Sequence, residues 1–247
     1  MVWFFGAAII VAISFTSAYA LGSSVPTWVV REGSAPTHFC YNRTWSTGLP
    51  VETCVELSVD SRALNVDFEV AQDPVQQNAY KQCNEDVFNQ EVVEVFVASD
   101  AAEVKKVKPE RYWEVELTPR GVAWVGYDSN PGGDRTNLTH VLHPCSSIQT
   151  AVTPRRGGWR GRISLPWELI GPGAPAEALT AGVHTGRLYR ANFFRVQMNP
   201  RAWVGRSVTT QDACGPANCT FLCANCPDTQ EPDFHHSGFF GNLIVQQ

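Results

Sequence analysis

Alternation of apolar and polar residues runs through much of the chain and predicts β-strands. Residues 55–70 carry an apolar side chain at nearly every second position and are interrupted by the polar stretch 60–63. This pattern is typical of a hairpin with one buried face. Residues 111–127 form a second pair of strand-like runs around Pro119 and Gly121, which occupy positions that β-turns favour. Two antiparallel hairpins are therefore expected.

Residues 89–97 are rich in valine, contain no glycine or proline, and predict a central strand covered on both sides. Glu94 is the exception within this apolar run. Because burying an unpaired carboxylate is costly, Glu94 must reach a cation, a ligand or the rim of the sheet. Two interpretations follow, an ion pair with an arginine on a neighbouring strand or a ligand contact, and they are compatible.

The remaining segments continue the β pattern. Further strands are expected at 159–165, 187–196 and 239–245, a short helical turn at 166–171, and a long loop at 128–153. No segment of ten or more residues has helical periodicity. Short strands joined by turns predict an all-β protein, an antiparallel two-sheet β-sandwich of jelly-roll-like form with long, disulfide-pinned loops.

The N-terminus has the character of a secretory signal. Residues 1–20 are apolar and end in Ala-Tyr-Ala, which signal peptidase can cleave, although an uncleaved anchor is the alternative. We expect residues 21–53 to lead into a single domain spanning 54–247. Three N-x-[ST] sequons also indicate secretion and N-glycosylation, at Asn42, Asn137 and Asn218.

The cysteines are even in number, eight in all, as expected of a disulfide-bonded extracellular protein. The pairs expected are Cys40 with Cys54 and Cys83 with Cys145. The last four would pair among themselves in one of three ways, and a zinc site is the alternative for them. These four are Cys214, Cys219, Cys223 and Cys226.

Composition excludes several functions. Charged residues make up 17% of the chain and the net charge is −5, which argues against nucleic-acid binding. No later segment is apolar enough to cross a bilayer, so no membrane association is expected after signal cleavage. No motif of a hydrolase, metalloprotease or phosphate-binding loop occurs. We expect a monomer without a cofactor, apart from a possible structural calcium ion in the acidic loops.

Five segments occur in an order that resembles the family 9 carbohydrate-binding modules and the wider DOMON-like β-sandwich group. They are Glu91–Phe96, Tyr112–Gly121, Ile163–Trp167, Arg190–Arg195, and Asp233–His236 followed by Phe240 and Gly241. The resemblance implies a β-sandwich that holds a sugar between two aromatic rings, with polar side chains bonding its hydroxyls. It implies structural roles for Phe234 and Gly241 and a link to carbohydrate catabolism through glycoside hydrolases, while alternation along the chain predicts core positions for Trp113 and Trp167.

The resemblance also implies the site residues. Phe88, six residues before Glu94, falls at one sugar-clasping aromatic, while Asn192 and Arg195 fall at polar positions of a late strand. The second aromatic is missing from residues 224–227, and Trp203 is the candidate to replace it. We further expect Glu94 and Arg195 to meet as an ion pair on adjacent strands.

The predicted function is therefore a secreted, non-catalytic module that binds a saccharide or polysaccharide. One alternative is an extracellular scaffold without a ligand. A second is a haem-binding redox domain, for which Met198 would be an axial ligand candidate. A third is a glycosidase using Glu91 and Glu94, although their odd separation places them on opposite faces of a strand. His235 and His236 are expected to be hydrogen-bonded structural residues.

Overall fold

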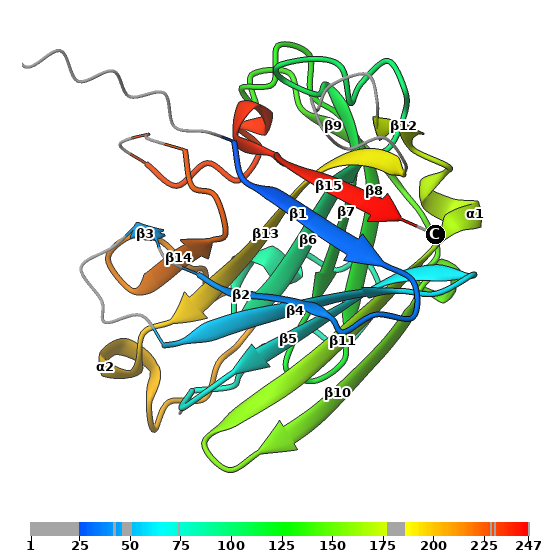
Figure 1. The fold of residues 1–247 in the computed structure, drawn as a ribbon. Coiled ribbons are helices and arrows are strands. Elements are labelled where there is room, and N and C mark those ends of the chain that lie inside the picture. The colour runs from blue at the N-terminus through cyan, green and yellow to red at the C-terminus, as the bar shows by residue number, and fades with distance from the viewer. Residues whose placement is uncertain are drawn as a thin grey trace, which may run out of the picture.

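A computed structural model shows two β-sheets packed face to face (Figure 1). It describes residues 25–41, 43–45, 51–73, 75–176, 186–227, 229 and 231–246. The expected signal sequence and the sequon at Asn42 lie outside these residues. No helix among the described residues is long and apolar enough to cross a membrane.

The larger sheet has ten strands among the described residues, and all its pairs are antiparallel except β1 with β15. Its main path runs, in spatial order, through β1 (Thr27–Arg31), β15 (Gly241–Gln246), β13 (Arg187–Met198), β6 (Val92–Ala98), β7 (Arg111–Leu117), β8 (Ala123–Ser129) and β9 (Thr139–Leu142). Three short strands flank β13, namely β12 (Ala174–Pro175), β14 (Cys219–Cys223) and, beyond β14, β3 (Arg43–Trp45).

The smaller sheet has five described strands, all antiparallel, and lies below the first in Figure 1. Its order is β10 (Gln149–Arg155), β11 (Gly158–Pro166), β5 (Ala63–Val70), β4 (Thr53–Val59) and β2 (Thr37–Cys40). Helical structure in the described part of the chain is limited to single turns. These are α1 (Trp167–Ile170), α2 (Pro200–Trp203) and the 3₁₀ turns Val87–Asn89, Cys145–Ser147 and Ser237–Phe239.

The main core lies between the two sheets. Alternation along β6 directs Val93, Val95 and Val97 into it, where they join Trp159 of β11. Burying each such side chain contributes roughly 1.5–3 kcal/mol to folding. Trp113 belongs to the same core, and Trp167 packs partly buried at its edge, as their positions in the sequence predict.

Gly241 has a packing role at the start of β15. A Cβ added there would lie 2.3 Å from Cζ3 of Trp28 and 2.9 Å from the carbonyl oxygen of Pro26. Any larger residue would therefore push the indole out of the core. Phe234, the other residue expected to be structural near the C-terminus, stacks on Phe194 with ring centroids 4.3 Å apart.

The predicted hairpins and the central strand are confirmed. The pairs β4–β5 and β7–β8 are hairpins, and the N–H of Gly121, at φ +82°, donates to the carbonyl of Thr118. β6 lies between β13 and β7 in the middle of its sheet. Gly171, at φ +82°, follows the single turn α1, as predicted.

Two predictions about the chain's organisation are wrong. The segment 128–153 is not a plain loop, because it contains β9 and most of β10. Both are edge strands with largely exposed residues, so neither has the buried apolar alternation by which a strand is recognised. Likewise, residues 21–53 do not merely lead into a domain that starts at 54, since β1 and β2 belong to the two sheets.

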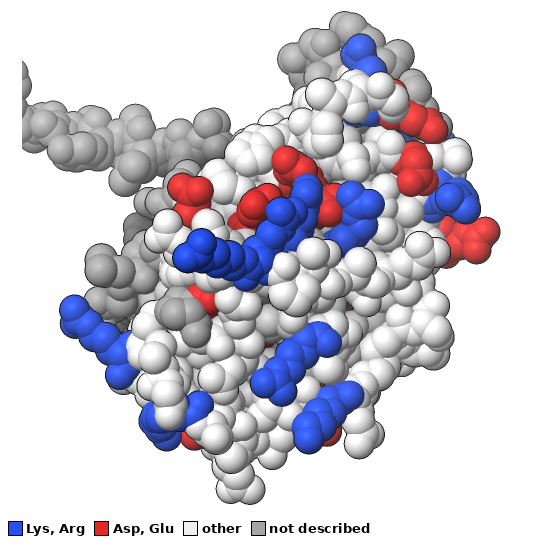
Figure 2. Space-filling model, turned by 90° about the horizontal axis from the view of Figure 1, so that it is seen from below, with Lys and Arg blue, Asp and Glu red and all other residues white. Residues whose placement is uncertain are grey.

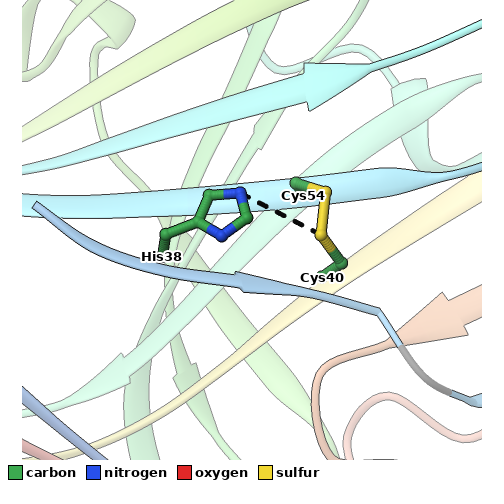
Figure 3. Close-up of side chains that lie close together, drawn as sticks. All are labelled: His38, Cys40 and Cys54. Atoms are coloured by element: carbon green, nitrogen blue, oxygen red, sulfur yellow. Dashed lines mark hydrogen bonds between the residues drawn. A yellow bond between two sulfur atoms is a disulfide. The ribbon is translucent and has the colours of Figure 1, made fainter.

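All eight cysteines form disulfides. The pairs are Cys40–Cys54, Cys83–Cys145, Cys214–Cys219 and Cys223–Cys226, which agrees with the first two predicted pairs and resolves the rest. A zinc site at the last four is excluded, because no thiolate remains to bind metal. Figure 3 shows Cys40 and Cys54 joined across β2 and β4, with His38 beside them.

Ion pairs cover the outer face of the five-stranded sheet. Arg160 pairs with Glu56 at 2.8 Å, and Arg162 pairs with Asp67 at 2.7 Å. Figure 2, seen from below, shows lysine and arginine side chains next to aspartate and glutamate over this side of the molecule. Positive and negative charges are interspersed on this face.

Candidate functional site

A pocket opens on the outer face of the ten-stranded sheet, with a volume of about 450 Å³. We call it the outer pocket; its lining includes Phe88, Glu94, Glu114, Glu116, Trp124 and His235. Alternation explains its position. The valines that flank the three glutamates point into the main core, so the glutamates point to the opposite side of the sheet.

Four carboxylates gather beneath the outer pocket, and we call them the acidic cluster. Glu94 on β6 is directly opposite Glu116 on β7, Glu114 lies two residues along β7, and Asp128 lies on β8. All are buried, with exposed fractions of 2% for Glu94 and 0% for Glu116 and Asp128. Like charges directly opposite each other on paired strands repel, so this arrangement is costly unless a proton or a cation is shared.

Burial raises the pKa of every member of the cluster. Burial, followed by the charge of Glu116, raises the pKa of Glu94 well above its usual 4.5, against the lowering effect of Arg135. Burial is also the main cause that raises the pKa of Glu114 well above 4.5, and the charges of Asp128 and Glu116 raise it further. Burial also raises the pKa of Glu116 to about 8 and that of Asp128 to about 6.

Two basic residues lie beside these acids. Arg135 lines the outer pocket, and its backbone N–H donates to Oδ1 of Asn130 over 2.9 Å. The ring of His235 has Nδ1 3.6 Å from Oδ2 of Asp128 and Nε2 4.0 Å from Oε1 of Glu114. Burial is the main cause that lowers the pKa of His235 to about 3, and the charges of Arg135 and His140 lower it further. The imidazole is therefore neutral at physiological pH.

Aromatic rings form the apolar part of the outer pocket. Phe88, on the 3₁₀ turn before β6, is 41% exposed. Phe221 of β14 and Phe234 are half-buried, and Trp124 of β8 lies over Gly126, where an added Cβ would be 2.2 Å from the indole. An accessible ring next to a buried carboxylate is a combination suited to a ligand with an apolar face and hydroxyl groups.

Of the residues predicted to bind sugar, Phe88 and Glu94 line the outer pocket and the others do not. Asn192 is fully buried, and its Nδ2 donates to the carbonyls of Asn225 and Phe239. Trp203 is only 3% exposed, and its Nε1 donates to the carbonyl of Asn218. Trp203 packs in an apolar cluster that also contains Trp124 and Val196 of the pocket lining, but its own side chain does not line the pocket, so it does not replace the missing aromatic as predicted.

The predicted ion pair between Glu94 and Arg195 is wrong. Nε and Nη2 of Arg195 donate to Oε1 of Glu91 at 2.9 and 2.6 Å, and Nη2 also reaches Oδ2 of Asp73 at 3.0 Å. Arg195 is fully buried between the sheets and lies on the opposite face of β13 from Phe194. It therefore stabilises the interior and does not line the pocket.

Sequence reasoning missed Glu114, Glu116, Asp128 and Arg135 as candidates. The glutamates do carry a signal, because they alternate with Trp113, Val115 and Leu117 and so share one face of β7. His235 has the structural hydrogen bond that was expected, between Nδ1 and the Tyr112 hydroxyl at 2.9 Å, and it also lines the pocket.

The residues that suggested a haem-binding or glycosidase function, and the predicted glycosylation sites, can be located in the structure. Met198, the haem-ligand candidate, is fully buried in the cluster around α2. Glu91 bonds Arg195 in the interior while Glu94 lines the outer pocket, so these two acids lie on opposite sides of the sheet, as the odd spacing predicts. Of the predicted glycosylation sites, Asn137 is exposed and Asn218 is half-buried.

Comparison with known proteins supports the fold. No family model matches the chain. An extracellular protein from Arthroderma benhamiae is 24% identical over 207 residues, which is 78% of each chain. Among solved structures, a protein from Bacteroides uniformis proposed to bind carbohydrate has a TM-score of 0.62 at 14% identity, over 89% of this chain and 99% of that one.

A family 9 carbohydrate-binding module from Caldicellulosiruptor kristjanssonii is similar in two solved complexes. The complex with cellotriose has a TM-score of 0.56 at 12% identity, over 90% of this chain and 94% of that one. The complex with glucose has a TM-score of 0.54 at 12% identity, over 90% and 96%. These likenesses show that the chain has a β-sandwich fold like that of the family 9 modules.

Proposed function

We propose that this chain is a secreted, non-catalytic carbohydrate-binding module that holds a saccharide in the outer pocket. The observation that carries the proposal is the exposed ring of Phe88 in the same pocket as the carboxylate of Glu94. The fold supports it, because similar structures include modules in complex with glucose and cellotriose. The fold alone would not be sufficient, since one fold serves many functions.

The chemistry of the pocket suits a sugar. Pyranose rings have an apolar face that packs on an aromatic ring, and this would be the role of Phe88. The carboxyl group of Glu94 lines the pocket and can exchange hydrogen bonds with sugar hydroxyls, while Arg135 can donate to a hydroxyl or ring oxygen. A volume of about 450 Å³ falls within the range of small-molecule sites.

The expected affinity is modest. An aromatic contact contributes about 0.5–1.5 kcal/mol beyond burial, and each hydrogen bond to a charged group about 1.5–3 kcal/mol net. One accessible ring and a few such bonds correspond to dissociation constants in the micromolar-to-millimolar range. Weak affinity of this kind is useful on a polysaccharide, where many sites are presented together.

A glycan array on the secreted protein would identify the ligand class, with glucose and cello-oligosaccharides included. Calorimetric titration of the best soluble oligosaccharide into wild type and Phe88→Ala would then test the site. We expect Phe88→Ala to weaken binding about two- to twelvefold. Val107→Ala is the control, because Val107 is an exposed apolar residue that is 80% accessible and does not line the pocket.

Two outcomes would contradict the proposal. If no glycan in a broad panel binds, a scaffold without a ligand becomes the better interpretation. If a glycan binds equally to wild type, Phe88→Ala and Glu94→Gln, the binding site lies elsewhere on the protein. Secretion, cleavage after Ala20 and glycan attachment at the three sequons belong to the same proposal and can be read from the intact mass before and after deglycosylation.

A further inference from the structure

We propose that Glu114, Asp128 and His235 bind one divalent cation of the zinc or manganese class beneath the outer pocket. Their donor atoms, one from each side chain, all lie within 4.8 Å of one another. Movements of about an ångström would bring them to the metal–ligand distances of about 2.0–2.2 Å that such ions require. The inference is independent of sugar binding, because it concerns the protein and a metal alone.

Three separate elements bring these donors together. Glu114 lies on β7 and Asp128 on the neighbouring β8, where it is directly opposite Tyr112, so the two carboxylates are diagonal neighbours on one face. His235 comes from the loop before the last 3₁₀ turn, and its ring lies over this face. The site therefore stands on two paired strands, which hold ligands more rigidly than a loop does.

Unsatisfied carboxylate oxygens point to a missing positive charge. Both oxygens of Asp128 and both of Glu116 are buried, and no N–H group of the described residues donates to them; the carboxyl group of Glu114 lies within hydrogen-bonding reach of both acids. Buried carboxylates ordinarily accept hydrogen bonds or coordinate a metal. A proton shared between Glu114 and Asp128 is the competing way to relieve the repulsion. The two possibilities differ in whether metal binds.

Hydrogen bonds around His235 match those found around metal-binding histidines. Nδ1 is 2.9 Å from the hydroxyl of Tyr112, which in turn accepts a hydrogen bond from Nδ2 of Asn130 at 3.0 Å. The same Nδ2 donates to the backbone carbonyl of His235 over 2.7 Å. In the tautomer whose Nδ1–H donates to Tyr112, Nε2 is left to coordinate the metal, and an outer partner of this kind fixes the orientation of the ring.

The donor set indicates the class of metal. Two carboxylates and one imidazole suit zinc or manganese, whereas calcium prefers six to eight oxygen ligands. The other group of metal-binding residue types in the described chain is His38, Cys40 and Cys54. It is not a comparable site, because its two sulfur atoms form a disulfide (Figure 3).

Metal titration tests the inference on the full secreted chain. Protein stripped with a chelator and dialysed would be titrated separately with zinc, manganese and calcium chloride by calorimetry, with no sugar present. We expect one zinc or manganese ion per chain, a raised melting temperature, and much weaker calcium binding. Asp128→Asn and His235→Gln should each weaken the zinc affinity at least about tenfold, and Tyr112→Phe about tenfold or more.

Matched controls separate this site from surface binding. His38→Gln removes an exposed histidine, and Glu231→Gln removes a carboxylate at the pocket rim, so neither should change the zinc affinity. Circular dichroism would confirm that each variant is folded. Absence of stoichiometric zinc and manganese binding to the wild type would overturn the inference in favour of the shared proton. Zinc binding that persists unchanged in folded Asp128→Asn and His235→Gln would also overturn it.

Discussion

Glu94 and Arg195 lie on adjacent strands but on opposite faces of the same sheet. Phe194 is directly opposite Glu94 in the β6–β13 register, so Arg195, one residue further, points to the other side. The arginine is consequently enclosed between the sheets with Glu91 and Asp73, while the glutamate lines the outer pocket. One residue therefore serves stability and the other is available for a ligand, and the two roles can be tested separately.

Removing Arg195 should strongly destabilise the fold. Arg195→Met would leave Glu91 and Asp73 as buried carboxylates without their cation, at a cost of about 3–5 kcal/mol in the free energy of unfolding. Glu56→Gln is the control, because Glu56 is 38% exposed in its pair with Arg160. That change should cost less than about 1 kcal/mol. Urea unfolding followed by circular dichroism measures both, and equal losses would contradict the interior role of Arg195.

Glu94→Gln, unlike Arg195→Met, should lower sugar affinity without lowering stability. The amide removes a buried acid that faces Glu116 and whose pKa burial already raises well above 4.5, so the melting temperature should be unchanged or higher. If a sugar hydroxyl bonds this carboxyl group, affinity should fall about two- to twelvefold, as expected for the loss of a hydrogen bond of about 0.5–1.5 kcal/mol. Thermal unfolding and calorimetry on the same sample test both parts. A large loss of stability would show that Glu94 is structural.

Trp203 should matter for stability and not for sugar binding. The indole is 3% exposed and packs with the residues around α2, with the guanidinium of Arg206 4.9 Å from its ring centre. Trp203→Ala should lower the free energy of unfolding by about 3–5 kcal/mol, as for other buried aromatic residues. The remaining folded protein should bind sugar with wild-type affinity. Selective loss of sugar affinity with unchanged stability would restore Trp203 to the site.

The disulfides should contribute unequally to the free energy of unfolding. Cys83–Cys145 closes a loop with a sequence separation of 62, whereas Cys223–Cys226 spans only 3. Because the entropy removed from the unfolded chain grows with loop length, the double serine variant of the first pair should cost about 4 kcal/mol and that of the second about 2 kcal/mol. Chemical unfolding of the two variants gives the comparison. The reverse order would mean that native-state effects dominate.

Glu103 should make the β6–β7 connection sensitive to acid. Burial alone would raise the pKa of Glu103, but hydrogen bonds from the N–H of Glu110 at 2.7 Å and from the side chains of Arg111 and Lys106 outweigh it and lower the pKa. A lowered folded-state pKa means that the stabilisation is present above the unfolded value of about 4.5 and is lost as pH falls through the folded value.

The measurement is the melting temperature of wild type and Glu103→Gln between pH 6 and pH 3. The wild type should be more stable than the variant at pH 6, and the difference should shrink below pH 4.5 because the carboxylate becomes protonated. A difference that stays constant over this range would show that the charge of Glu103 does not stabilise the loop.

The sequence by itself determined the two hairpins and the central strands, and which face each residue takes along its own strand. Alternation identified the two hairpins and the central β6, because side chains of a strand point to opposite sides at every step. It also placed Glu94 opposite to the core valines and Glu91 on the other face. The edge strands β9 and β10 were not predicted, because exposed strands need no apolar alternation.

Only the tertiary structure decided which residues meet. Because of the register between β6 and β13, Arg195 forms its ion pair with Glu91 and not with Glu94. The approach of His235 to Asp128, 107 positions earlier in the chain, depends on how a late loop folds over the sheet. Local pattern cannot supply this information, because alternation defines a face within one strand, whereas a site requires the register and packing of several strands at once.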